Sequence, residues 1–384
     1  MLTQTQLKKI VIIPRVTGGF STIGSSLIMY MILSEKQKLK RIYYRLMLGI
    51  SIFDFISSVA YLFGTMMLPK GSIWLATGND NTCTMQGAMF QIGLGVMYYN
   101  SALMLYYLLR IRYGFSDDWI QNSVEIWMHF VSLFIILAST VTGLILRVYN
   151  QVGTICFTGD YPIGCTKNPK VECQRGEHYY PFFWVSSGVP MITSVAWLCI
   201  SLLMILSTVA KTRNTMKRYD STRSSTQDQS KRKTLADKVT QIFTSSSQKS
   251  SSTNSISIEV VEIKRTRRKN RKGDLSREAR LQAIRYVLAY ITCFIWPLII
   301  RALVGTKTEI PFALFILGNF FGPLQGLLNY LNFVWPRAQI LRRRNQANTF
   351  LHAIFLSTFV KESVLKRRSL QARVQRSHMR RSKD

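Results

Sequence analysis

One acidic side chain, Asp54, lies within an otherwise apolar stretch of the sequence, LGISIFDF. A carboxyl group is costly to bury in a hydrophobic setting, so it is a candidate for function. It can hold a sodium ion or a proton, or organise a hydrogen-bond network that switches the fold; the alternative is a neutral carboxyl with a structural role. Candidate partners in other apolar stretches are Asn100, Ser101, Asn319, Gln325 and Asn329.

The other reactive residue types are not arranged for catalysis or metal binding. The histidines, His129, His178, His352 and His378, are scattered along the chain, and no HExxH or GxSxG motif occurs. Zinc sites and serine hydrolases need several ligands or partners at characteristic spacings. We therefore expect no enzyme, no cofactor and no metal site.

Seven apolar segments make up nearly half of the chain and must position these residues. A bilayer core about 30 Å thick is crossed by roughly 20 helical residues. Most segments are apolar on all sides, unlike the amphipathic helices of soluble proteins. We predict an all-α membrane protein, a seven-transmembrane helix bundle within residues 10–337, with helices at about 10–33, 44–68, 84–110, 125–147, 181–210, 284–304 and 310–335.

The charge is unevenly distributed between the two sides of this predicted bundle. The chain has 50 Lys and Arg against 19 Asp and Glu, a net charge of +31, yet 47% of its residues are hydrophobic. Most of the basic residues follow the first, third, fifth and seventh segments, which indicates a cytoplasmic side. We predict a short extracellular N-terminus (1–9), a multi-pass protein of the plasma membrane, and a cytoplasmic tail (338–384), with no nucleic-acid partner.

Four cysteines fall on the predicted outer side, which is the oxidising side. Cys83 begins the third segment, and Cys156, Cys165 and Cys173 lie in the loop between the fourth and fifth segments. We expect Cys83 to form a disulfide with one of these three, and the other two to bond with each other. The sequence leaves open which of them pairs with Cys83.

The predicted cytoplasmic segments are polar and basic. Residues 211–283, the third cytoplasmic loop, contain Ser/Thr-rich runs between clusters of Lys and Arg, a composition typical of disorder. The loop is either a site for kinases and arrestin-like adaptors or a solvated linker near anionic inner-leaflet lipids. Residues 337–344 predict a basic surface helix, and the apolar residues 349–360 either continue it or dock on the bundle.

Several motifs mark hinges and helix ends. Trp296–Pro297 and Gly322–Pro323 predict kinks in the sixth and seventh helices, because proline removes a backbone hydrogen bond. The third helix opens with Cys83-Thr-Met-Gln86-Gly87 and closes with Tyr106-Tyr107-Leu108-Leu109. The seventh helix contains Pro323-Leu324-Gln325-Gly326, then Asn329, Tyr330 and the closing Trp335-Pro336-Arg337.

These motifs resemble those of the cyclic-AMP-receptor-like G-protein-coupled receptors of protists and fungi, and of the secretin/adhesion receptors. The resemblance implies a receptor that binds a small extracellular ligand and activates a heterotrimeric G protein. It implies a helix-three disulfide at Cys83 and a helix-seven hinge at Gln325-Gly326. Two features depart from the rhodopsin-like receptors. The nearest counterpart of their Asp-Arg-Tyr, Ile111-Arg112-Tyr113, lies four residues late relative to Cys83, and the seventh helix contains no Asn-Pro-x-x-Tyr.

Depth and side-chain type select the candidate contact residues. Arg301 can meet an anionic ligand or extend to lipid headgroups. The other candidates for ligand binding are Tyr61, Trp74, Tyr98, Asn100, His178 and Trp184. Those for switching are Asp54, Trp296, Pro297, Pro323, Gln325 and Gly326, and those facing a G protein are Arg110, Arg112 and Tyr113.

Three other functions were weighed against the receptor. The principal alternative is a seven-helix transporter or channel, although the broken helices are not paired between the two halves as inverted repeats would require. A retinal pigment needs a lysine in the seventh helix, which residues 310–335 lack; Lys307 lies outside that span. A membrane enzyme finds no support in the motifs.

Overall fold

The structure is a computed structural model of the 384-residue chain. It describes residues 3–168, 170–211, 214–215, 281–300, 302–303, 311–343, 346–360 and 364. The chain forms two compact units, one of residues 1–201 with 282–384 and the other of residues 202–281. The second unit is helical where it is described, and the account below concerns the first.

In the described part of the chain, seven helices are long and apolar enough to cross a membrane, in agreement with the predicted all-α membrane bundle. They span Gln4–Leu33, Ile42–Met67, Asp80–Ile111, Glu125–Ile145, Tyr179–Lys211, Leu281–Ile300 and Phe312–Arg343. We refer to them as the first to the seventh helix.

The first four of these helices are built from the following helical elements, with short connections between them. The first is α1 (Gln4–Leu33), and the second is α3 (Ile42–Phe63) with the 3-10 turn η1 (Gly64–Met67); α2 (Lys36–Leu39) connects them. The third is α4 (Asp80–Gly93) and α5 (Gly95–Ile111), interrupted at Leu94, and the fourth is α7 (Glu125–Ile145), preceded by α6 (Asp117–Ser123).

The later helices contain the irregular turns. A hairpin of β1 (Tyr149–Val152) and β2 (Ile155–Thr158) and the 3-10 turn η2 (Cys165–Lys167) precede the fifth helix. The fifth begins with α8 (Tyr179–Phe183) and the π-helical turn η3 (Trp184–Gly188). The seventh is α11 (Phe312–Phe321), the 3-10 turn η4 (Gly322–Leu324) and α12 (Gln325–Arg343), and α13 (Phe350–Phe359) follows.

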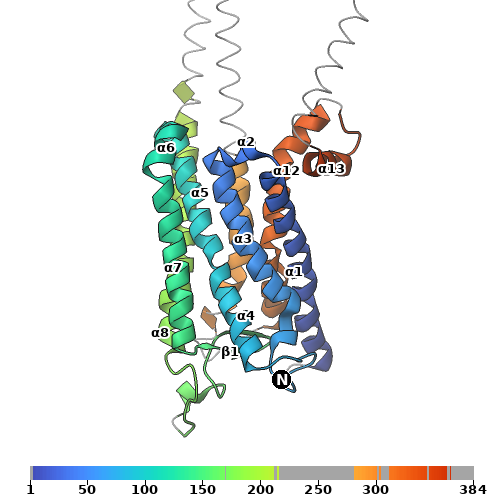
Figure 1. The fold of residues 1–384 in the computed structure, drawn as a ribbon, viewed down its shortest axis with the longest axis vertical. Helices are drawn as coiled ribbons and strands as arrows, with labels where there is room; N and C mark the ends of the chain where they lie inside the picture. Colours follow the sequence, from blue (N-terminus) through green and yellow to red (C-terminus); the bar gives the residue numbers. More distant parts are fainter. Residues whose placement is uncertain are drawn as a thin grey trace, which may run out of the picture. The chain divides into compact units, whose positions relative to one another are not determined.

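The two ends of the bundle differ in structure (Figure 1). The N-terminus and β1 lie at one end, which we call the hairpin end. The opposite end, which we call the α2 end, contains α2, α6 and α13. The basic residues of α2 and the last turn of α12 therefore share one end of the bundle.

The start of the first helix and the end of the seventh differ most from the predicted boundaries. The first helix begins at Gln4 rather than residue 10, because Thr3 and Gln6 form a capping box in which each side chain bonds the other's backbone N–H. Residues 4–9 are therefore helical and not a free tail. The seventh helix continues to Arg343, so residues 338–343 extend it rather than forming a separate surface helix.

The apolar segment after the seventh helix docks on it, one of the two alternatives that the sequence left open. Ala353 and Leu356 of α13 form a small core with Ala338 and Leu341 of α12. The Tyr330 hydroxyl lies 2.8 Å from Thr358 Oγ1. The predicted disordered loop 211–283 lies largely outside the described residues, as does most of the tail beyond residue 360.

The seventh helix packs closely on the first at Gly326. The Gly326 N–H donates to Ser21 Oγ at 2.8 Å, and a Cβ at Gly326 would collide with the Ser21 and Ser25 hydroxyls. Only glycine allows the two backbones to approach this closely. Gly326, which the resemblance placed in a helix-seven hinge with Gln325, therefore also fixes the contact between two helices that are far apart in sequence.

Candidate functional site

A cavity of about 200 Å³ extends from β2 toward the middle of the bundle. Its walls come from α3, α4, α5, β2, the fifth and sixth helices, the turn η4 and the start of α12. Much of the wall is apolar and aromatic: Phe90, Phe157, Phe183, Met191 and Phe294. A concave apolar space with a few polar groups is the usual form of a small-molecule site.

The cavity brings together five of the residues selected from the sequence: Asp54, Tyr61, Pro297, Pro323 and Gln325. They come from three helices, so the fold gathers residues that had been chosen for separate reasons. Ser57, Ser58 and Ser187 add hydroxyl groups to the wall, and Cys293 adds a thiol. The serines had not been selected, because they carry no distinctive spacing in the sequence.

Asp54 forms its hydrogen bond with the seventh helix. Its side chain is 2% exposed, and Oδ2 accepts a hydrogen bond from Asn329 Nδ2 at 2.7 Å. Of the five candidate partners, the structure thus selects Asn329. Three others bond to their own helices: Asn100 donates to the Val96 carbonyl, Ser101 to that of Met97 and Asn319 to that of Phe315.

Replacing Asn329 with alanine is expected to lower the free energy of unfolding by about 1–3 kcal/mol, because a buried carboxyl loses its partner. The matched control is Asn319→Ala, which removes an amide that donates to the carbonyl of Phe315 in its own helix. We expect the control to have less than half the effect. Thermal unfolding of the two purified variants in detergent measures the difference, and equal midpoints would contradict the assignment.

The helices that surround the cavity are irregular beside it. In the seventh helix, η4 contains Pro323, which lines the cavity, and in the sixth Pro297 lines it. In the fifth, the π-helical turn η3 places Ser187 on the wall. Such π-turns occur frequently at functional sites. The two prolines were found in the sequence, whereas the π-turn has no sequence signature.

The β1–β2 hairpin is tied to the third helix at the hairpin end. Cys83 is bonded to Cys156 of β2, which resolves the pairing that the sequence left open, and Cys165 is bonded to Cys173. Gln86 is fully buried; its Nε2 donates to the carbonyls of Ala60 and Gly64, and its Oε1 accepts from the Cys156 N–H at 2.9 Å.

These contacts explain the Cys-x-x-Gln-Gly motif physically. Gln86 joins the second helix to the hairpin, and these hydrogen bonds satisfy both its amide nitrogen and its amide oxygen in a buried position. At Gly87 a Cβ would lie 2.6 Å from the Tyr149 Cβ, so the strand requires glycine there. The motif therefore holds β2 in place, and β2 contributes Ile155 and Phe157 to the cavity wall.

The rest of the loop before the fifth helix is ordered around Asp160. Oδ1 accepts from the Gly164 N–H at 3.1 Å, and Oδ2 accepts from the Thr166 N–H at 3.1 Å and from its hydroxyl at 2.7 Å. Burial raises the pKa of Asp160, but these hydrogen bonds outweigh it, so the pKa lies below the ordinary value for aspartate. The carboxylate form therefore stabilises this loop.

Acid is expected to loosen this loop. The pKa of Asp160 is lower in the folded protein than in the unfolded chain. The Asp160 carboxylate therefore stabilises the folded loop fully above the unfolded pKa of about 4, and this stabilisation is lost as the pH falls through the folded pKa. The protection of the Gly164 and Thr166 amides against hydrogen exchange, taken relative to the intrinsic exchange rate at each pH, should fall in that range in the wild-type protein. Asp160→Asn should show the lower protection already at pH 7, and an unchanged pH profile in this variant relative to wild type would contradict the assignment.

The other residues selected for ligand contact do not line this cavity. Trp74 is exposed, with Lys8 Nζ 5.6 Å from its ring centroid, and His178 is exposed before α8. Tyr98 lines a separate groove between the third, fourth and fifth helices, and Trp184 packs against Phe183. Asn100 is buried within its own helix, and Arg301 lies outside the described residues.

Two of the residues selected for switching also lie off the cavity wall. The Trp296 ring stacks on Phe321 of the seventh helix, with ring centroids 6.1 Å apart. Gly326 faces the first helix. The sixth and seventh helices thus contact each other through an aromatic pair beside their prolines.

A second, larger space of about 780 Å³ opens at the α2 end. It is lined by basic, acidic and aromatic side chains of α2, α3, α5, α6 and α12, among them Lys40, Arg41, Tyr44, Asp117, Phe333 and Arg337. Arg110, Arg112 and Tyr113 are exposed at this end but do not line the space. Arg110 lies 3.3 Å from Asp117 in an exposed ion pair. In the sequence, Lys40 and Arg41 are among the basic residues after the first apolar segment, which indicated the cytoplasmic side and no binding role.

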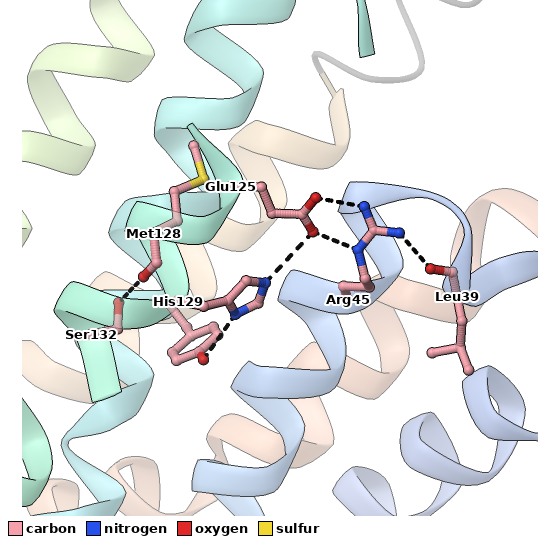
Figure 2. A network of polar contacts seen from close by, with 7 residues as sticks. Leu39, Arg45, Glu125, Met128, His129 and Ser132 are labelled. Atoms are coloured by element: carbon pink, nitrogen blue, oxygen red, sulfur yellow. Dashed lines mark hydrogen bonds and ion pairs between the residues drawn. The ribbon is translucent and has the colours of Figure 1, made fainter. Parts of the chain in front are cut away.

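A partly buried polar network joins three helices near the α2 end (Figure 2). Arg45 of α3 binds Glu125 of α7 through two parallel hydrogen bonds of 2.5 Å, and its third nitrogen donates to the Leu39 carbonyl. The His129 Nε2 lies 3.6 Å from Glu125, and its Nδ1 lies 3.0 Å from the Tyr99 hydroxyl of α5. Sequence inspection missed this network, because Arg45 and Glu125 each stand at the end of an apolar segment.

The described residues contain no group of three or more His, Cys, Asp or Glu side chains that could hold a metal ion. The described residues form a helical bundle with seven helices long and apolar enough to cross a membrane, a largely apolar cavity toward one end and a charged cleft at the other. No protein-family model and no curated protein matches this sequence.

Proposed function

We propose that this chain is a cell-surface receptor that binds a small extracellular ligand and signals through a heterotrimeric G protein. The observation that carries the proposal is the arrangement of the cavity. It lies against the irregular turns of the fifth and seventh helices and against Pro297 of the sixth, and the buried Asp54–Asn329 pair is at its wall.

The proposed orientation follows from the chemistry of the two ends. Disulfides persist in oxidising compartments, so the hairpin end, with its two disulfides, faces the exterior. The basic residues of α2 and α12 face the cytoplasm and the anionic inner leaflet. The site of action is then the plasma membrane.

The proposed mechanism is a shift between two packings of the bundle. A ligand that binds one packing more tightly favours it by the difference in binding free energy. Because the prolines and the π-turn lie on the cavity wall, a ligand contacts the segments where these helices bend most easily. Movement of the same helices reshapes the cleft at the α2 end, where Arg41 and Arg337 present positive charge to a G protein.

The partners follow from this mechanism. The G protein takes the cleft, and kinases and arrestin-like adaptors act on the Ser/Thr-rich residues 211–283. The proposal assigns no catalytic step to the chain and no cofactor or metal. The resemblance in the third and seventh helices supports it, because Gln86 and Gln325 occupy structural positions at the hairpin and the cavity.

The test is G-protein dissociation in cells that express the full chain with a panel of Gα subunits. Small-molecule pools should produce a response with at least one subunit. The double variant Lys40→Glu/Arg41→Glu, which reverses charge in the cleft, should abolish the response while surface expression persists. If no pool activates any subunit, and proteoliposomes with the purified protein concentrate a solute, the transporter alternative replaces the receptor.

A further inference from the structure

We propose that the ligand of the cavity is a small, mainly apolar alcohol or phenol, held by its hydroxyl between Asp54 and Gln325. The inference rests on the proposed receptor function for its biological meaning, but binding itself can be measured without any signalling. Three features of the cavity support it: its size, its apolar wall and the pairing of polar groups at Asp54 and Gln325.

The size of the cavity limits the ligand to about ten non-hydrogen atoms. An apolar cavity of roughly 150 Å³ holds one benzene molecule, and this cavity measures about 200 Å³. A nucleotide, with more than about 20 non-hydrogen atoms, does not fit in that volume. The rings of Phe90, Phe157 and Phe294 on the wall favour a flat or aliphatic apolar body.

The positions of the polar groups follow from one turn of the seventh helix. Gln325 and Asn329 are four residues apart on α12, so they are neighbours on one helix face. Asn329 holds the Asp54 carboxyl, and Gln325 lies one turn closer to η4, on the cavity wall. The cavity therefore presents a carboxyl acceptor and an amide donor near each other.

The amide of Gln325 is unsatisfied. Its side chain is 95% buried, and Nε2 has no hydrogen-bond partner among the residues that the structure describes. An unpaired buried amide is unfavourable, so a ligand group that accepts its hydrogen bond is bound more tightly. The ligand therefore needs a hydrogen-bond acceptor for Gln325 Nε2.

A hydroxyl is the group that satisfies both residues. Its hydrogen donates to the Asp54 carboxyl while its oxygen accepts from Gln325 Nε2. A protonated amine can donate to Asp54 but has no lone pair for Gln325. A carboxylate or phosphate can accept from Gln325 but faces Asp54, and none of the described residues on the cavity wall is Lys, Arg or His to offset its charge.

Four probes with one carbon skeleton separate these possibilities: 2-phenylethanol, 2-phenylethylamine, phenylacetate and ethylbenzene. Their binding to the purified full chain in lipid nanodiscs is measured by calorimetry and by the shift in thermal unfolding. We expect 2-phenylethanol to bind at least about tenfold more tightly than each of the others, the factor that one added hydrogen bond gives. Tighter binding of the amine or the acid would overturn the proposal, as would binding of no probe.

Variants locate the binding. Gln325→Leu should reduce the advantage of the alcohol over ethylbenzene about tenfold, and Gln325→Met serves the same purpose if the leucine variant does not fold. The matched control is Gln339→Leu, the same change at an exposed position of the same helix, which should leave all affinities unchanged. Ile155→Trp, at the cavity wall in β2, should weaken all four probes. An unchanged preference in both Gln325 variants contradicts the assignment.

Failure of this inference is distinguishable from failure of the proposed function. If 2-phenylethanol binds as expected but no ligand activates a G protein, the cavity assignment stands and the receptor proposal fails. If other small molecules activate a G protein while 2-phenylethanol neither binds nor competes with them, the receptor proposal stands and this inference fails.

Discussion

Replacing Glu125 with glutamine is expected to lower the free energy of unfolding by about 3–5 kcal/mol, the usual effect of breaking one side of a buried ion pair. The Glu125 side chain is 8% exposed, and that of Arg45 is 24% exposed. The variant leaves the Arg45 guanidinium without a carboxylate between α3 and α7. His129 loses the same neighbour, so the contact with Tyr99 of α5 is weakened too.

The experiment compares thermal unfolding of Glu125→Gln with that of Asp117→Asn in the same detergent. Asp117 pairs with Arg110 at the surface, where both side chains are about half exposed. Such exposed pairs contribute about 0–1 kcal/mol, so the control should unfold near the wild-type midpoint. The double variant Arg45→Met/Glu125→Leu should recover much of the loss, because it removes both charges. Equal effects of Glu125→Gln and Asp117→Asn would refute the assignment.

Removing the disulfide between the third helix and the hairpin, in Cys83→Ser/Cys156→Ser, is expected to have a comparable effect. The bond joins residues 73 positions apart. A crosslink of that span stabilises the folded state by about 4 kcal/mol through the entropy of the unfolded chain. Because β2 lines the cavity, we also expect ligand binding there to be lost.

The matched control is Cys165→Ser/Cys173→Ser, whose bond spans 8 positions and whose residues do not line the cavity. The same relation gives about 2.5 kcal/mol for this shorter span, and cavity binding should persist. Thermal unfolding and calorimetric binding of one probe molecule measure the two effects. Loss of binding in the control but not in Cys83→Ser/Cys156→Ser would show that the hairpin is not held as described.

The sequence alone determined the number of long apolar helices, because hydropathy and length are local properties of each segment. It also located the two prolines that line the cavity, since proline disturbs any helix that contains it. The cysteines on one predicted side indicated disulfides before their pairing was known. At Gln4 and Arg343 the helix ends differed from the prediction, because hydropathy does not register a capping box or a polar final turn.

Only the tertiary structure decided which residues meet. Asp54 had five candidate partners, each able to donate a hydrogen bond, and packing of the second helix against the seventh selected Asn329, which is 275 residues away. The same packing left Gln325 Nε2 on the cavity wall without a hydrogen-bond partner among the described residues, and it placed Trp74, Tyr98 and His178 elsewhere. The Arg45–Glu125 pair likewise depends on the contact between two helices. The physical reason is that rotation and depth of packed helices are set by many long-range contacts at once, and no single segment encodes them.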